Sequence, residues 1–287
     1  QALGTLPSEF ARLKSLQVLD LFHTQLKTFP RQIAKLTNLR RLDLSYNQLR
    51  KIPPEIGQFR NLEELALDFN KVIGIPQEIG QLTNLRKLDL SENKLTAVPP
   101  AIGQLRNLRS LDLSCNRLKE VPPEIGQLTN LEELQLGLNE LIAIPPEIGQ
   151  LTNLRELNIF ENKLTSLPAA IGQLRNLQLL YVSFNQLKKI PADVGQLRNL
   201  RKLYASYNQL TGIPLEVTKL KNLQTLDLSS NQLRKIPSEI VELPHLKSID
   251  LGENPNLEQP PREIAEKGKR GTKAILSYLR NLQREKE

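Results

Sequence analysis

The stretch LRKLDLSENKLTAVPPAIGQLRN, residues 85–107, is followed directly by LRSLDLSCNRLKEVPPEIGQLTN, residues 108–130. The leucines, the central Asn, the two Pro and the Gly hold the same places in both segments. The chain therefore repeats itself every 23 residues. A fixed period of this length indicates stacked structural units rather than one conventional globular core.

The period runs through most of the 287-residue chain without an insertion. With the first leucine of each unit as position 1, the pattern is L-x-x-L-x-L-x-x-N-x-L-x-x-I-P-x-x-I-x-x-L-x-N. Position 1 recurs at Leu16, Leu39, Leu62, Leu85, Leu108, Leu131, Leu154, Leu177, Leu200, Leu223 and Leu246.

Each unit has the same expected local structure. Position 4 is apolar between polar neighbours, which predicts a short strand over positions 3–5. The Asn at position 9 follows the strand, where its amide can satisfy backbone groups in a bend. The Pro at position 15 fixes an extended backbone before a segment too short for a long helix, so we expect 3₁₀ or single helical turns there.

The pattern resembles the leucine-rich repeat over essentially the whole chain. The resemblance implies an α/β solenoid, a horseshoe or arc with a short-stranded parallel sheet on the concave face. Short 3₁₀ or helical turns are then expected on the convex face.

Both ends of the chain depart from the period. Residues 1–15 supply only the second half of a repeat, and the 23-residue units begin at Leu16. Near the other end, five apolar residues fall on one helical face: Ala274, Ile275, Tyr278, Leu279 and Leu282. We expect a solenoid over 1–260 and a C-terminal helical cap over 261–287 that covers the last coil.

The units written IPPEIGQLTNL are similar to those of leucine-rich-repeat proteins from pathogenic leptospires. The closing PPREIAEKGKRGTKAILSYL is also similar to the segment that ends such repeats in bacterial and Roco-type proteins. The resemblance implies a protein-protein interaction module on the concave face, in a secreted or cell-surface bacterial effector or adhesin that contacts host proteins. Intracellular Ras-related adaptors share much of the consensus, so a cytoplasmic adaptor for a small GTPase is the alternative.

Charge and hydropathy exclude several other classes of protein. The net charge is +8, but half of it lies between Arg262 and Glu287, where eight basic residues accompany four acidic ones. Elsewhere basic pairs alternate with acidic pairs, which breaks the continuous basic stripe that phosphates require, so we expect no nucleic-acid partner. No apolar run is long enough for a transmembrane segment. A monomer is the expected state.

Catalytic and metal-binding constellations are sparse. Asp89 and Asp112 occupy position 5 of adjacent repeats, about 5 Å apart on one face, and are weak candidates for a calcium site. Similar Asp residues recur beside basic neighbours, which favours a solvated polar face. Cys115 lies several repeats from either His. We therefore expect neither an enzyme nor a cofactor.

Aromatic residues concentrate at positions 5, 7 and 8, which should face away from the core. Tyr181 and Phe184 stand where Asp89 and Glu92 stand four repeats earlier. Exposed aromatic patches mark interaction sites, although position 8 could instead pack against its own turn. The partner-binding residues predicted on the concave face are Phe160, Tyr181, Phe184, Tyr204, Tyr207, Leu138, Tyr46 and Phe69.

Overall fold

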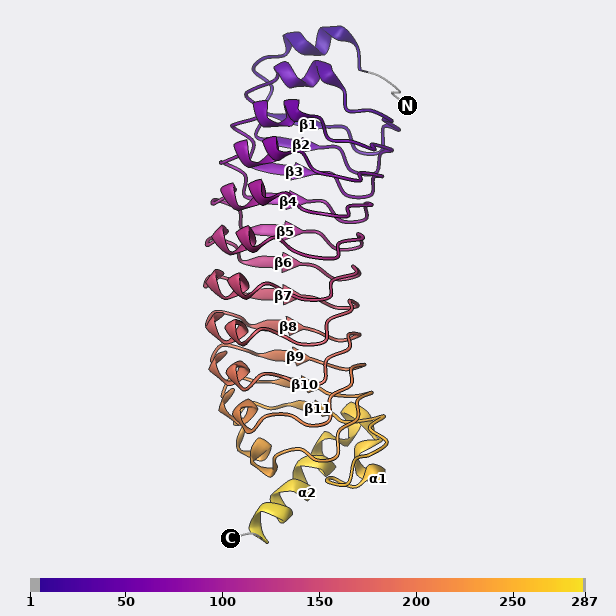
Figure 1. Cartoon of the computed structure of the whole chain (residues 1–287), viewed down its shortest axis with the longest axis vertical. Coiled ribbons are helices and arrows are strands. Elements are labelled where there is room, and N and C mark those ends of the chain that lie inside the picture. The colour runs from indigo at the N-terminus through magenta and orange to yellow at the C-terminus, as the bar shows by residue number, and fades with distance from the viewer. Residues whose placement is uncertain (1–5, 286–287) are drawn as a thin grey trace. The chain divides into compact units, whose positions relative to one another are not determined.

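The computed structural model describes residues 6–285 (Figure 1). Residues 1–5 of the expected partial repeat and residues 286 and 287 of the expected cap lie outside that range. The chain forms two compact units, Gln1–Leu141 and Ile142–Glu287. Each unit is a solenoid of parallel strands and 3₁₀ turns, which confirms the predicted fold class.

The first unit contains six three-residue strands, each at positions 3–5 of its repeat as predicted. They are β1 (Val18–Asp20), β2 (Arg41–Asp43), β3 (Glu64–Ala66), β4 (Lys87–Asp89), β5 (Ser110–Asp112) and β6 (Glu133–Gln135). Its 3₁₀ turns are η1 (Ser8–Arg12), η2 (Arg31–Lys35), η3 (Pro54–Gln58), η4 (Gln77–Gln81), η5 (Pro100–Gln104) and η6 (Pro123–Gln127). Consecutive strands pair in parallel and in register, so that equivalent positions of neighbouring repeats stand side by side.

The second unit continues the same plan and adds the C-terminal helices. Its strands are β7 (Glu156–Asn158), β8 (Leu179–Tyr181), β9 (Lys202–Tyr204), β10 (Thr225–Asp227) and β11 (Ser248–Asp250). Its turns and helices are η7 (Pro146–Gln150), η8 (Ala169–Gln173), η9 (Ala192–Gln196), η10 (Leu215–Lys219), η11 (Ser238–Glu242), α1 (Arg262–Ala265), η12 (Gly268–Gly271) and α2 (Thr272–Arg284). These strands also pair in parallel, in the order of the chain.

The core of each repeat is built from the predicted inward positions. In the second repeat the apolar side chains at positions 1, 4, 6, 11 and 18 are fully buried: Leu39, Leu42, Leu44, Leu49 and Ile56. The Pro at position 15 precedes each 3₁₀ turn in an extended conformation, as at Pro122 with φ −66° and ψ 144°. The restricted φ of Pro therefore fixes how the chain enters each turn.

The Asn at position 9 bridges neighbouring repeats. Asn185 is buried; its Oδ1 accepts the Leu164 N–H at 3.0 Å, and its Nδ2 donates to the Ile159 carbonyl at 2.9 Å. The same Nδ2 also reaches two carbonyls of its own turn, those of Val182 and Ser183. The amide thus satisfies backbone groups of two repeats, which confirms the predicted role.

The Gly at position 19 is required by close packing between repeats. A Cβ added at Gly103 would lie 2.6 Å from the Glu124 carbonyl oxygen of the next turn. No Gly at this position has a positive φ, so the Gly is needed for the close approach of consecutive turns rather than for the backbone conformation of its own turn.

The C-terminal segment covers the edge of β11. Thr272 lies 23 residues after Ile249, and its hydroxyl accepts the Ile249 N–H at 3.2 Å. Ile275 and Leu279 of α2 are fully buried. The helix therefore supplies apolar cover and a hydrogen-bond acceptor where a further strand would pair, although the boundary between 260 and 261 stays a prediction.

Candidate protein-binding surface

The turn after each strand holds the residue at position 8 in the left-handed region. Its φ lies between 51° and 56° in every repeat, and the residue is never Gly or Asn. In this conformation the side chain leaves the turn toward solvent, as the 41% exposure of Phe184 and 47% of Tyr207 show. Because neither Gly nor Asn marks the position, the sequence alone does not reveal this geometry.

The second unit carries a cluster of five aromatic rings in two columns, which we call the second-unit cluster. Its members are Phe160, Tyr181, Phe184, Tyr204 and Tyr207. At position 5, Tyr181 and Tyr204 stack with ring centroids 4.6 Å apart and an interplanar angle of 5°. At position 8, Phe184 and Tyr207 stack with ring centroids 4.1 Å apart. Phe160, at position 7 of the preceding repeat, meets Phe184 edge-on with centroids 5.1 Å apart. The structure thus brings five of the eight predicted residues together.

Small residues at position 7 lie between the two columns. Ser183 and Ser206 are buried, and their hydroxyls are 2.9 Å apart. The Ser183 Oγ also accepts the Ser206 N–H at 3.1 Å. These serines hydrogen-bond to each other. The surface between the two columns of rings therefore does not need hydrogen bonds from a partner.

Partial burial affects the chemistry of one column. Burial raises the pKa of Tyr181, and the neighbouring Tyr204 adds to the effect. The phenol therefore remains protonated at neutral pH and is available as a hydrogen-bond donor. The position 5 pair can offer a partner both apolar area and polar contacts.

The first unit carries a single column of rings at positions 7 and 8, which we call the first-unit cluster. It consists of Phe22, His23, Tyr46 and Phe69. Tyr46 and Phe69 stack at 4.1 Å, and Phe22 meets Tyr46 at 5.1 Å. His23 lies parallel to Tyr46 at 6.4 Å. Of these four, the prediction named only Tyr46 and Phe69. His23 occupies the same position 8 one repeat before Tyr46, and Phe22 occupies position 7 of that repeat.

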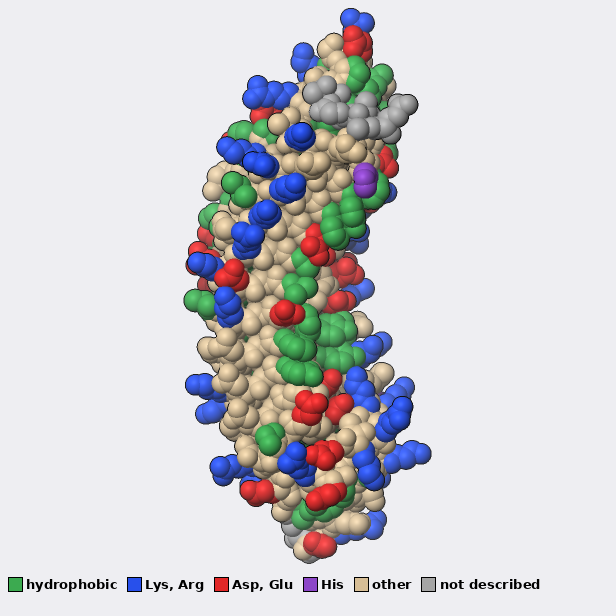
Figure 2. All heavy atoms as spheres, turned by 90° about the vertical axis from the view of Figure 1, so that its right-hand side faces the viewer, with side chains coloured by type: hydrophobic (Ala, Val, Ile, Leu, Met, Phe, Trp, Pro, Cys, Tyr) green, Lys and Arg blue, Asp and Glu red, His purple; other side chains and the backbone are tan. Residues whose placement is uncertain are grey.

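Figure 2 shows hydrophobic side chains gathered on this face over the strand-to-turn edge of each unit. Leu138 at position 8 belongs to the first unit and is 41% exposed. Its exposure fits the predicted binding role, while its place beside Phe160 stays a prediction.

Asp89 and Asp112 lie on adjacent paired strands, as predicted. Each carboxylate accepts hydrogen bonds from the backbone N–H and the hydroxyl of the serine two residues later, Ser91 or Ser114. Burial raises the pKa of Asp112, with Asp89 nearby adding to it. These carboxylates hold the turn after the strand, and no group of three potential metal ligands occurs within residues 6–285.

Cys115 is a poor nucleophile in this setting. Burial raises the pKa of its thiol to about 12, and the hydrogen bond and charge of Glu92 contribute further. The reactive form of cysteine is the thiolate, which is scarce at neutral pH under these conditions.

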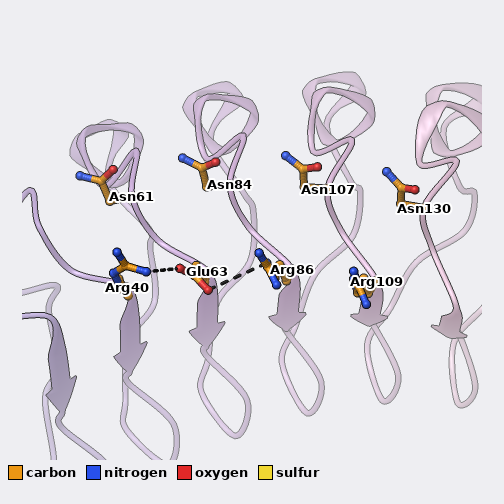
Figure 3. Close-up of a pocket in the computed structure, with 8 residues that line it drawn as sticks. All are labelled: Arg40, Asn61, Glu63, Asn84, Arg86, Asn107, Arg109 and Asn130. Atoms are coloured by element: carbon orange, nitrogen blue, oxygen red, sulfur yellow. Dashed lines mark hydrogen bonds and ion pairs between the residues drawn. The ribbon is translucent and has the colours of Figure 1, made fainter.

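A polar hollow of about 400 Å³ lies at the opposite end of the strands in the first unit (Figure 3). Asn side chains at position 23 face Arg and Glu side chains at position 2. Glu63 accepts from Arg40 at 2.8 Å and lies 3.9 Å from Arg86. One carboxylate therefore neutralises much of the charge that two arginines bring to this hollow.

The repeat models match nearly the whole chain. The model described as "Leucine-rich repeat region" matches residues 1–91, 71–162 and 145–212, and "Leucine rich repeat" matches residues 198–255. A leucine-rich-repeat protein of Leptospira interrogans is 32% identical, over 97% of this chain and 92% of its own, with a TM-score of 0.50. The chain belongs to the leucine-rich repeat family.

Other solved structures share the architecture. The ectodomain of the Arabidopsis thaliana membrane receptor kinase GASSHO1/SCHENGEN3, in complex with CASPARIAN STRIP INTEGRITY FACTOR 2, is 34% identical over 87% of this chain and 38% of its own, with a TM-score of 0.58. The functional domain of InlJ from Listeria monocytogenes is 25% identical over 87% of this chain and 56% of its own, with a TM-score of 0.66. No curated protein matches the chain.

No helix within the described part of the chain is long and apolar enough to span a bilayer.

Proposed function

We propose that this protein is a non-enzymatic interaction module that binds a protein partner through the exposed face of its sheet, with the second-unit cluster as the main contact. The observation that carries the proposal is the double column of rings. Asp occupies position 5 in six other repeats, so the solenoid does not need Tyr there. Rigid aromatic side chains bury much area at low entropic cost, which makes them effective anchors in interfaces.

The family relationship supports a binding role rather than catalysis. The receptor ectodomain among the similar structures is described in complex with CASPARIAN STRIP INTEGRITY FACTOR 2. In this chain, Asp89 and Asp112 accept hydrogen bonds that hold the turns after their strands, and the Cys115 thiol is largely protonated at neutral pH. The partner's surface should therefore be apolar at its centre, to match the rings.

We further propose a secreted or surface-exposed bacterial protein that contacts host proteins. Support comes from the similarity to the Leptospira and Listeria structures. The test is antibody labelling of intact cells that express the natural gene, against labelling after permeabilisation. Signal that requires permeabilisation would contradict surface exposure, and absence from the culture medium as well would contradict secretion.

The binding proposal is tested by capture from candidate host-cell extracts, identification of the captured protein and titration calorimetry with that protein in purified form. The variant replaces Tyr181 and Tyr204 by Asp, Phe184 by Glu and Tyr207 by Ser, all residues found at equivalent positions. Central aromatic anchors often contribute about 2 kcal/mol or more apiece, so binding should fall below detection.

The matched control is the first-unit variant Tyr46→Glu with Phe69→Glu, which should bind nearly as the parent does. The four-site variant loses three ring contacts, Tyr181–Tyr204, Phe184–Tyr207 and Phe160–Phe184, which should lower its stability by about 1.5–4.5 kcal/mol. Circular dichroism must therefore show that it is folded at the temperature of the titration. Undiminished binding by a folded four-site variant would refute the proposed surface.

A further inference from the structure

The edge where the strands begin differs in charge between the two units. In the first unit Glu63 neutralises Arg40 and Arg86, and Arg109 lies 3.6 Å from Glu132. In the second unit, from Arg175 onward, five exposed cations occupy positions 22 and 2 with no acid at either position between them. We call them the basic edge: Arg175, Arg198, Arg201, Lys221 and Lys247.

Within residues 142–285, which the structure describes, no ion pair joins a cation of the basic edge to an acidic residue. Position 22 is Thr in several other repeats, including Thr37, Thr83 and Thr152, so the fold does not require a cation there. Like charges in adjacent repeats repel one another, and a bound anionic partner would relieve that repulsion.

The basic edge borders a hollow of about 750 Å³ beside η9 and η10. Arg175, Arg198 and Lys221 line it along three consecutive repeats. Asp193, Glu216 and Lys219 also line it, and Glu216 lies 3.8 Å from Lys219. Because cations outnumber carboxylates in this lining, the hollow can hold an extended chain with separated negative charges.

Asn side chains interleave with the cations and offer hydrogen-bond acceptors. At position 23, Asn199 and Asn222 donate through Nδ2 to the Arg175 and Arg198 carbonyls at 2.9 and 2.8 Å. Both side chains are exposed, so each Oδ1 can accept from a ligand. A peptide brings backbone N–H donors to those oxygens, whereas phosphate and sulfate groups bring only acceptors.

We propose that the basic edge binds an acidic, extended peptide segment that runs along the stack of repeats. Repeats lie about 4.8 Å apart and an extended chain advances about 3.3 Å per residue, so every third residue meets every second repeat. Carboxylates at that spacing can meet Arg175 and Lys221, which lie two repeats apart, and Arg can bind a carboxylate in bidentate fashion. The inference rests on the proposed function in taking a polypeptide as ligand, but uses different residues.

The test needs no natural partner. The probe is a labelled peptide Glu-Ser-Gly-Glu-Ser-Gly-Glu, titrated with the intact protein by fluorescence polarisation at low salt. We expect saturable binding that weakens as salt is added. The triple variant Arg175→Gln, Arg198→Gln, Lys221→Gln should raise Kd about ten-fold or more.

The matched control is Arg60→Gln with Arg106→Gln, which removes cations from position 22 of the first unit, where Thr separates them. It should change Kd by less than about two-fold. Equal weakening by this control would overturn the proposal, because binding would then follow net charge alone. Lack of binding, or tighter binding of a sulfated oligosaccharide or single-stranded DNA at the same cations, would also overturn it.

The proposed function can be separated from this inference by the four-site aromatic variant. That variant should bind the acidic peptide as the parent does while losing its protein partner. If the peptide fails to bind but the aromatic variant still loses its partner, only the basic edge assignment is withdrawn.

Discussion

The two aromatic clusters are built on the same repeat but differ in width. The first-unit cluster is one column at the strand-to-turn edge, and the sheet beside it carries Asp20, Asp43 and Ala66 at position 5. The second-unit cluster adds the Tyr181–Tyr204 pair at that position. Stacked rings at position 8 occur in both clusters, whereas a stacked pair at position 5 occurs in the second-unit cluster alone. The wider cluster is therefore the better candidate for a binding surface.

The largest expected effect is on partner affinity, and it distinguishes the position 5 column of the second-unit cluster from the position 8 column. Tyr181→Asp with Tyr204→Asp should lower partner affinity about 30-fold or more, since one anchor of about 2 kcal/mol accounts for that factor. The new carboxylates should be tolerated, because paired strands already place Asp227 beside Asp250. Calorimetry with the purified partner measures the change.

Phe184→Glu with Tyr207→Ser is the companion variant at position 8. If only this position 8 variant lowered partner affinity, the position 5 pair would not distinguish the second-unit cluster as a binding surface. The first-unit cluster would then be an equally good site, and its variants should be titrated against the same partner.

The next effect tests whether the repeats that carry the two clusters are equally stabilised by their buried Asn side chains. Asn70→Ala and Asn185→Ala each remove a buried amide that bonds three carbonyls and one N–H. Each should lower the free energy of unfolding by about 1–3 kcal/mol, because buried backbone groups lose their partners. Urea unfolding measures both. Values that differ by more than about 2 kcal/mol would show that the repeats are not energetically equivalent.

A smaller effect concerns the stacked rings themselves. Phe184 contacts two rings and Phe69 contacts one. At about 0.5–1.5 kcal/mol per aromatic pair, Phe184→Ala should destabilise more than Phe69→Ala. Glu161→Ala, which has the same left-handed backbone without a ring, is the control and should stay within about 0.5 kcal/mol. If all three variants lost the same amount of stability, ring stacking would contribute nothing to the stability of the fold.

The smallest effect is a pH dependence at position 5. The pKa of Asp112 is raised above its ordinary value of 3.8, chiefly by burial. The native state therefore binds more protons between 3.8 and the raised value, and stability falls as pH rises through that window. Asp112→Asn should flatten this part of the profile and leave the variant more stable than the parent at neutral pH. Urea unfolding of both proteins across the acid range measures this. If the free energy of unfolding changed equally with pH in the parent and in the variant, the prediction would be wrong.

The sequence was sufficient for the solenoid because each inward leucine and each Asn at position 9 has a single compatible place in the coil. The register of the strands follows directly from the period, and it places Tyr181 beside Tyr204. The sequence could not reveal the left-handed turn, because residues as different as Glu92 and Phe184 adopt it. Nor could it show that Thr272 would hydrogen-bond the last strand, because that contact depends on how α2 folds back.

The distribution of tyrosines gives this molecule a built-in optical reporter. The chain has no Trp and five Tyr, so its near-ultraviolet absorption and fluorescence come mainly from tyrosine. Four of those five lie in the two clusters, and only Tyr278 lies elsewhere. A partner that covers the rings would change the emission of the unlabelled protein directly, and a Trp-free peptide ligand at the basic edge would leave it almost unchanged.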